Sequence, residues 1–261
     1  MRGTTRFSLF LFLILFISQC QTSPTGRRQL ILVKDPQMNQ LGAEAFQDMK
    51  SKIPIERSEA INRYVNCIVQ AELAVTEDDT GVTSWEVVVF KENSPNAFAL
   101  PGGKIGVHTG MLSVAKTSDQ LAAVIGHEIG HVIARHGNER VSQNQVTQGG
   151  MEALSKIGKG EMAGILGGGA KFGILLPFSR KHESEADIIG LEIMSKSGFD
   201  PRESVTLWEN MSAMSSGKPN ELLSTHPSDE TRMKQLNEKM PGALELRQKA
   251  VQEGRIPSCK L

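Results

Sequence analysis

The clearest candidates for chemistry in this chain are two histidines and a glutamate within five residues: His127, Glu128 and His131 in HEIGH. This H-E-x-x-H spacing is typical of a helix that binds zinc through both imidazoles. Side chains four residues apart lie on one helix face, so His127 and His131 can contact one metal ion. Glu128 lies about 100° further round, where it can act as a general base without binding the metal. The pattern alone is expected by chance in roughly one such chain in a hundred, so the context decides.

The residues around the motif predict the helix that such a site requires. Thr117 and Gln120 have the spacing of a capping box, and apolar residues recur at helical spacing over 121–133. Gly126 and Gly130 each cost a helix about 1 kcal/mol relative to alanine, which indicates that a strand or a substrate backbone packs closely there. The alternative is a buried helix with hydrogen-bonded core histidines, in which the intervening glutamate would be an unexplained charge.

A third metal ligand is expected downstream, because a catalytic zinc usually binds three protein ligands and keeps one position open. The segment 179–187, SRKHESEAD, offers it. Glu183 and Asp187 share a helix face. We assign Glu183 as the ligand and Asp187 as the acceptor of the other ring N–H of a ligand histidine. Glu185 points elsewhere and is expected in a solvated turn. His182 is a further candidate ligand, although an exposed position beside a lysine is the favoured interpretation.

These motifs together resemble the M48 family of zinc metalloproteases. HEIGH, ESEAD at 183–187 and the Thr-His-Pro triplet at 225–227 follow one another in the family's order. Three longer stretches fit its branch of bacterial periplasmic and outer-membrane lipoprotein peptidases: TGRRQLILV at 25–33, NAFALPGGKIGVHTGML at 96–112 and LPFSRKHESEAD at 176–187. The resemblance covers nearly the whole chain from about Thr25 onward. It implies an α+β, mainly helical, zincin-like (gluzincin) fold with a small antiparallel sheet packed on the HExxH helix, and one Zn²⁺ per chain.

The segment 84–107 predicts strands beside the zinc helix, with a Pro-Gly-Gly turn at 101–103. Proline and paired glycines suit an edge strand, and an exposed edge can bind an extended peptide through main-chain hydrogen bonds. The resemblance implies this substrate-binding role for Asn96, Ala97 and Phe98. The alternative is a plain hairpin packed on the helix, and both interpretations stay open.

His226 is the candidate for stabilising the oxyanion, where a protein donor usually assists the metal. The single tyrosine, Tyr64, lies far upstream, and Pro227 begins a predicted helix that would hold His226 at its entrance. In the resembling family, a histidine in this context lies near the metal, and in some members it is thought to block the metal in a resting state. Arg232 also matches the family's pattern, for pairing with a carboxylate or for contacting substrate. The alternative for His226 is a surface loop.

The N-terminus is typical of a lipoprotein signal. Two arginines precede the apolar run 7–18, which is too short to span about 30 Å of hydrocarbon and has the length of a signal-peptide core. We therefore expect a signal peptide at 1–19, an acylated Cys20 as the first mature residue, and a single M48-like domain over 20–261. Gln19 departs from the usual Gly or Ala before such a cysteine, so ordinary signal cleavage is the alternative.

Composition favours one soluble enzyme domain. The 29 lysines and arginines balance 29 aspartates and glutamates, so nothing favours a nucleic-acid partner. Membrane attachment is expected only through the lipid, because no second apolar run is long enough to span a bilayer. An exported chain can form disulfides, for which Cys67 and Cys259 are the candidates, although the sequence does not show that they meet.

The rest of the chain predicts mainly helices. We expect one at 58–73, one that opens at 200–201, and two that follow Pro227 and Pro241. Nine glycines in 149–173 favour small-residue helix packing. A mobile lid and a loop that touches a membrane are the alternatives.

The expected function is that of a zinc-dependent endopeptidase in protein quality control. It would cleave unfolded or misassembled polypeptides in the periplasm of a diderm bacterium, anchored to the outer membrane. The competing interpretations are a zinc-bound chaperone-like or assembly factor with weak or latent protease activity, and a hydrolase of small-molecule amides. Glu128 and the lack of metal-spaced cysteines argue against a purely structural zinc.

Overall fold

The computed structural model of the chain describes residues 20–157, 178–214, 226 and 230–261. The predicted signal peptide at 1–19 and residues 158–173 of the glycine-rich segment lie outside these ranges. The strands are β1 (Cys20–Thr22), β2 (Arg28–Leu30), β3 (Glu86–Phe90), β4 (Ala97–Leu100) and β5 (Lys104–His108). The helices are α2 (Asp35–Lys52), α3 (Glu59–Leu73), the 3₁₀ helix η1 (Thr109–Ser113), α4 (Ser118–Ile133), α5 (His136–Ile157), α7 (Arg180–Lys196), α8 (Glu203–Met214) and α10 (Glu230–Gln252). The described fold is mainly helical with small sheets, as predicted.

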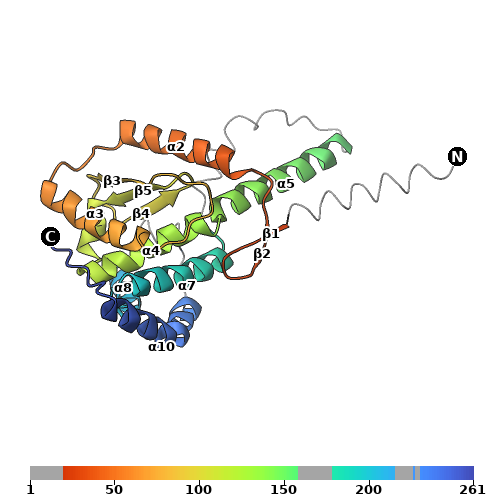
Figure 1. Ribbon diagram of the computed structural model, residues 1–261. Coiled ribbons are helices and arrows are strands. Elements are labelled where there is room, and N and C mark those ends of the chain that lie inside the picture. Colours follow the sequence, from red (N-terminus) through yellow and green to blue (C-terminus); the bar gives the residue numbers. More distant parts are fainter. Residues whose placement is uncertain (1–19, 158–177, 215–225, 227–229) are drawn as a thin grey trace.

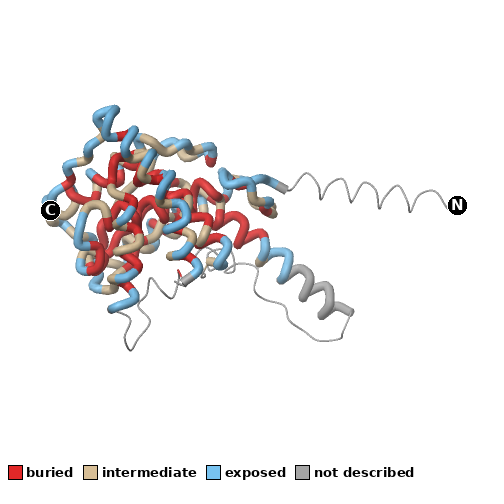
Figure 2. Tube along the Cα trace, turned by 90° about the horizontal axis from the view of Figure 1, so that it is seen from below, coloured by how far each residue is buried: buried red, intermediate tan, exposed pale blue. Residues whose placement is uncertain are grey.

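Helix α4, which carries HEIGH, forms the centre of the molecule (Figure 1). The sheet and α2 lie on one side of it, and α7 and α10 lie on the other. Every residue from Gln120 to Ile133 is buried, and Figure 2 shows buried segments gathered in the middle of the molecule with exposed segments around them. The Thr117 hydroxyl accepts a hydrogen bond from the Gln120 N–H at 3.1 Å, so the predicted cap is confirmed. The Gln120 side chain instead accepts from the N–H of Lys116.

The glycines of α4 lie against another helix, and the expected strand or substrate backbone is therefore wrong. A Cβ atom at Gly126 would lie 2.9 Å from the carbonyl oxygen of Gly190, and one at Gly130 would lie 3.0 Å from that of Ala186. A Cβ atom at Gly190 would in turn lie 2.6 Å from the backbone nitrogen of His127. Small residues thus let α4 and α7 approach closely, which brings the motifs of the two helices together.

The three strands beside α4 form a mixed sheet, whereas an antiparallel sheet was expected. The strand order is β3-β5-β4, and β5 pairs parallel with β3 and antiparallel with β4. The chain reverses twice, after β3 and again at the Pro-Gly-Gly turn, so the third strand runs in the direction of the first and inserts between the other two. Gly102 and Gly103 have φ values of +83° and +69°, which side chains disfavour. As predicted, β4 lies at the edge of the sheet.

Two helices differ from the expectations. Pro241 was expected to start a helix, but it lies inside α10. A proline leaves the carbonyl four residues earlier, that of Asn237, without its helical hydrogen bond. Both residues are exposed, so water can hydrate that carbonyl and the helix continues. Helix α2 was not predicted, although Asp35-Pro36 at its start repeats the signal used at 200–201.

A disulfide joins Cys67 in α3 to Cys259 near the C-terminus, across a sequence separation of 192. Because it closes a long loop, reduction is expected to lower the free energy of unfolding by about 2–4 kcal/mol. Urea denaturation with and without reductant measures this difference. The double variant Cys67→Ala/Cys259→Ala should show no response to reductant, and an equal denaturation midpoint for the wild type in both conditions would contradict the prediction.

None of the helices in the described ranges has both the length and the hydrophobicity needed to cross a bilayer.

Candidate metal centre

Four buried side chains bring their donor atoms together, two from α4, one from α7 and one from position 226, before the start of α10. They are His127, His131, Glu183 and His226, and one ligand atom from each lies within 4.8 Å of all the others. The first three are the residues that the sequence predicts as metal ligands. Helix α4 presents both histidines on one face, and the close approach of α7 places Glu183 opposite them.

The donor spacing fits a zinc ion. The Nε2 atoms of His127 and His131 are 3.0 Å apart, and each lies 3.4 Å from an oxygen of Glu183. Tetrahedral ligands about 2.0–2.1 Å from zinc are separated from one another by about 3.3 Å. Imidazole and carboxylate groups are also the donors that zinc takes in catalytic sites. Three residues thus lie where they can hold one zinc ion.

His226 lies closer to the donor atoms than an oxyanion donor requires. Its Nδ1 atom is 3.2 Å from Nε2 of His127 and 3.2 Å from both carboxylate oxygens of Glu183. Its Nε2 atom lies 3.6 Å from Oε1 of Glu128. In this arrangement His226 supplies a fourth donor atom. The alternative of an exposed surface histidine is wrong, because the side chain is buried.

Glu128 adjoins the donor atoms without belonging to them. Its Oε2 atom accepts a hydrogen bond from the N–H of Ala99 in β4 at 3.2 Å. Among the described residues, its Oε1 atom has no hydrogen-bond partner. Burial is the main cause that raises the pKa of Glu128 above its ordinary value. A carboxylate beside a metal-binding group, with a raised pKa and with one oxygen that forms no hydrogen bond to any described residue, suits a general base.

Asp187 and Arg232 lie behind the donor atoms. Oδ1 of Asp187 is 2.9 Å from Nδ1 of His127, which is the contact predicted for it. Arg232 binds both oxygens of Asp187 at 2.6 and 2.7 Å and one oxygen of Glu183 at 2.9 Å, and its guanidinium lies over the ring of Trp208. Burial would raise the pKa of Asp187, but Arg232 and His127 outweigh it and lower that pKa. Arg232 is 2 % exposed. Of its two predicted roles, the structure therefore fits pairing with carboxylates and not direct contact with a substrate.

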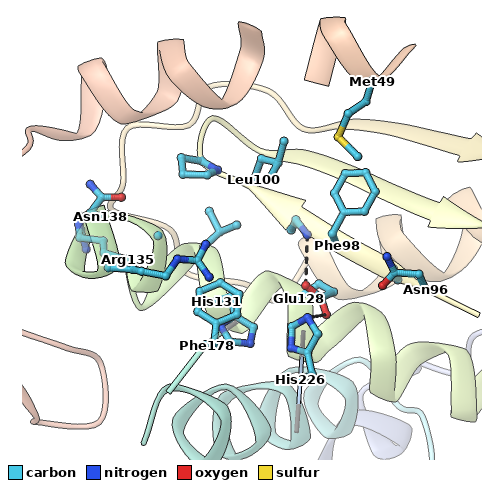
Figure 3. Close-up of a pocket in the computed structure, with 16 residues that line it drawn as sticks. Met49, Asn96, Phe98, Leu100, Glu128, His131, Arg135, Asn138, Phe178 and His226 are labelled. Carbon is cyan, nitrogen blue, oxygen red and sulfur yellow. Dashed lines mark hydrogen bonds and ion pairs between the residues drawn. The ribbon is translucent and has the colours of Figure 1, made fainter. Parts of the chain in front are cut away.

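A cavity of about 250 Å³ opens beside Glu128, between β4 and the end of α4. Figure 3 shows Glu128 and His226 pointing toward each other at its floor, with Phe98 and Met49 above them. The predicted substrate-binding residues Asn96, Ala97 and Phe98 all line it. Its remaining apolar lining comes from Ala99, Leu100, Pro101, Val132 and Phe178.

The register of β4 shows which of its main-chain groups point away from β5, toward the cavity. The carbonyl of Asn96 accepts from the N–H of His108, which places Asn96 in a hydrogen-bonded pair with the neighbouring strand. Partners alternate along an antiparallel ladder, so the main-chain groups of Ala97 and Ala99 point away from that strand. The contact between Ala99 and Glu128 agrees with this direction. The free edge of β4 therefore runs directly past the general-base candidate.

Comparison with known proteins assigns the family. The chain matches Peptidase family M48 over residues 59–240, which is more than half of its length. The chain belongs to this family. It is 40% identical to the mitochondrial metalloendopeptidase OMA1 of Schizosaccharomyces pombe over 69% of this chain and 53% of that protein. It is 33% identical to the mitochondrial metalloendopeptidase OMA1 of Danio rerio, over 92% of this chain and 54% of that protein.

A bacterial relative is less similar. The β-barrel assembly-enhancing protease of Escherichia coli is 27% identical over 74% of this chain and 42% of its own length. This M48 chain spans about half the length, or less, of the first relatives. The family and the four donor residues together confirm the expected zinc metalloprotease and its zinc cofactor.

The relatives overturn the expected location. Relatives that are 33% to 41% identical to this chain are named as mitochondrial enzymes, so the prediction of a bacterial periplasm and outer membrane is wrong. The bacterial lipoprotein branch is likewise not supported. No finding bears out the signal peptide or acylation of Cys20, whose backbone starts strand β1.

A second buried polar network lies behind His131 in this M48 peptidase. Glu185 was expected in a solvated turn, but it is buried and bonds to Ser23, Thr25, Arg27 and His136. His182 was expected to be exposed, but it is buried and lies 3.1 Å from Glu139. Both expectations failed because the N-terminal hairpin and α5 cover the start of α7, a tertiary contact that sequence spacing does not reveal.

The stability of this network is expected to depend on pH through Glu139. Burial would raise the pKa of Glu139, but hydrogen bonds from His182 and Arg27 outweigh it and lower the pKa to about 2. A carboxyl whose pKa is lower in the folded state stabilises that state above its unfolded pKa, near 4.5. This contribution is lost as the pH falls from about 4.5 toward 2.

Unfolding free energies of the wild type and Glu139→Gln between pH 7 and 2.5 measure this contribution. The wild type should be the more stable protein at neutral pH, and the difference should shrink below about pH 4.5. Glu238→Gln, in a surface pair, serves as the control because its curve should parallel that of the wild type. A difference that stays constant across the range would contradict the prediction.

Proposed function

We propose that this chain is a zinc-dependent endopeptidase in which His127, His131 and Glu183 hold the metal and Glu128 is the general base. One observation carries the proposal: the carboxylate of Glu128 contacts the edge of β4 through Oε2 and faces His226 of the donor group through Oε1. Zinc, when bound, supplies Lewis-acid polarisation at this point. Glu128 would take a proton at Oε1 from the attacking water and deliver one to the leaving amine.

The edge of β4 supports an extended polypeptide as the substrate class. The main-chain groups of Ala97 can pair with any backbone in an extended conformation, and so can the carbonyl of Ala99, whose N–H donates to Glu128. Recognition therefore depends little on side-chain identity. The cavity walls above Glu128 are mainly apolar and include Phe98, Leu100 and Val132. Unfolded segments offer both an unpaired backbone and exposed apolar side chains. A role in protein quality control follows from this preference, and the names of the matched relatives favour a mitochondrial setting.

His226 supports two successive roles in this proposal. As a fourth donor it would keep the metal centre closed at rest. Its ring lies beside Glu128, where a substrate would have to reach the metal. Displaced from the donors, its ring N–H could stabilise the oxyanion, the role predicted from the sequence.

The same closure favours a second candidate function. Structural zinc sites have four protein ligands, and this chain brings four donors together. An assembly or chaperone-like factor with latent protease activity would use the edge of β4 for binding alone.

Cleavage mapping separates the two functions. Protein carrying one zinc per chain is incubated with denatured casein, and the fragments are sequenced by mass spectrometry. We expect cuts at internal bonds, loss of cleavage with a chelator and recovery with added zinc. Binding of the substrate by zinc-loaded protein without any cleavage would support the assembly factor and refute the endopeptidase.

A further inference from the structure

The candidate ligand His131 is held on its far side by a second histidine. Its Nδ1 atom lies 2.9 Å from Nδ1 of His136, the residue that begins α5. With Nε2 of His131 directed at the metal donors, its ring proton resides on Nδ1 and is donated to His136. His136 must then carry its own proton on Nε2, which lies 3.1 Å from Oε2 of Glu185. Each hydrogen bond thereby fixes the tautomer and orientation of the next ring.

Glu185 is fixed in turn by the N-terminal hairpin. Nε of Arg27 binds its Oε2 atom at 2.7 Å, and the hydroxyls of Ser23 and Thr25 donate to its Oε1 atom. The other end of the Arg27 guanidinium binds both oxygens of Glu139, at 2.9 and 2.6 Å. The carboxylate of Glu185 is buried and receives several donors, so its position is strongly determined.

The two metal-binding histidines of α4 are thus supported differently. His127 contacts a carboxylate directly, that of Asp187, whereas His131 reaches Glu185 through the inserted ring of His136. Arg27 lies 32 residues before the start of the family match at residue 59. The hairpin therefore adds to the metal centre from outside the segment that the family match covers.

We propose that Arg27, Glu185 and His136 form a positioning relay for His131, and that the β1–β2 hairpin is in this way a working part of the zinc site. The relay rests on the proposed function, because it requires His131 to be a ligand. None of the three residues lines the cavity, so they act through His131 and not on the substrate. Partners of this kind typically change metal affinity by about 10- to 100-fold when removed.

Zinc affinity of full-length variants tests the relay. Dissociation constants are measured by chelator competition for Arg27→Met and Glu185→Gln, and the visible spectrum of the cobalt-substituted protein reports the ligand geometry. We expect affinity to fall about 10- to 100-fold in both variants and the cobalt spectrum to change. Arg247→Met is the matched control. Arg247 is also partly buried and lies near a carboxylate, that of Asp200, which belongs neither to the metal donors nor to the proposed relay. Its zinc affinity should equal that of the wild type.

Two further variants keep the test decisive. Circular dichroism of the metal-free proteins shows whether each variant folds. If Arg27→Met does not, Ser23→Ala/Thr25→Val keeps Arg27 and removes both hydroxyl hydrogen bonds to Glu185, together with the bond from the Arg27 N–H to Ser23. Wild-type affinity and cobalt spectrum in the folded relay variants would overturn the relay alone. A wild-type chain that binds no zinc, or a Glu183→Gln variant that binds it as tightly as the wild type, would overturn the proposed zinc site itself.

Discussion

Replacement of Glu128 by glutamine is expected to lower the rate of peptide cleavage by about 10²- to 10⁴-fold while zinc stays bound. Glutamine keeps the size of the side chain and can accept the hydrogen bond from Ala99, but it cannot take a proton from water. Because Glu128 is not among the grouped metal donors, zinc content should be unchanged. Cleavage of a fluorogenic peptide under saturating zinc, with metal content measured on the same sample, provides both quantities.

Glu192→Gln is a suitable control for this substitution. Glu192 lies on the exposed side of α7 and pairs with Lys196 one turn away, so its replacement should change neither quantity. Turnover of Glu128→Gln at the wild-type rate would rule out Glu128 as the general base.

Replacement of Arg232 by methionine is expected to lower the free energy of unfolding of the zinc-free protein by about 3–5 kcal/mol. Methionine fills much of the same space, but the carboxylates of Glu183 and Asp187 would lose their buried counter-charge. The contact with the ring of Trp208 would change as well. Chemical denaturation in the presence of a chelator measures the loss without a contribution from the metal.

Arg202→Met calibrates this measurement. Arg202 also pairs with an aspartate, Asp200, but at the surface, where such pairs contribute little to stability. A loss for Arg232→Met no larger than that for Arg202→Met would mean that the buried carboxylates do not depend on this guanidinium.

Local spacing was sufficient to predict three of the four residues whose donor atoms meet. His127 and His131 follow from the four-residue repeat of a helix, and Glu183 with Asp187 repeats the same spacing on a second helix. Helices α3, α4 and α7 begin at a serine or threonine side-chain cap, so nearby sequence marks where they start. What spacing cannot supply is the distance between helices. The glycines of α4 and Gly190 set that distance, and their partner was wrongly expected to be a strand or a substrate.

The buried network behind His131 was beyond sequence reasoning for the same reason. His136 lies five residues after His131, and Arg27 stands in the TGRR segment that entered only through the resemblance. Sequence spacing does not place His136 or Arg27 beside Glu185. The contact with Arg27 depends on how a hairpin more than 100 residues away packs on α7. For this reason Glu185 was expected in a solvated turn, whereas its partners bury it.

Zinc titration of the metal-free chain tests the central proposal most directly. Peptide cleavage is followed as zinc is added in fractions of an equivalent, for the wild type and for Glu183→Gln. We expect wild-type activity to rise in proportion to zinc and level off at one zinc per chain, and the variant to stay inactive at that ratio. Cleavage by the metal-free wild type, or full activity of Glu183→Gln at one equivalent, would contradict the assignment of this site as a zinc-dependent peptidase centre.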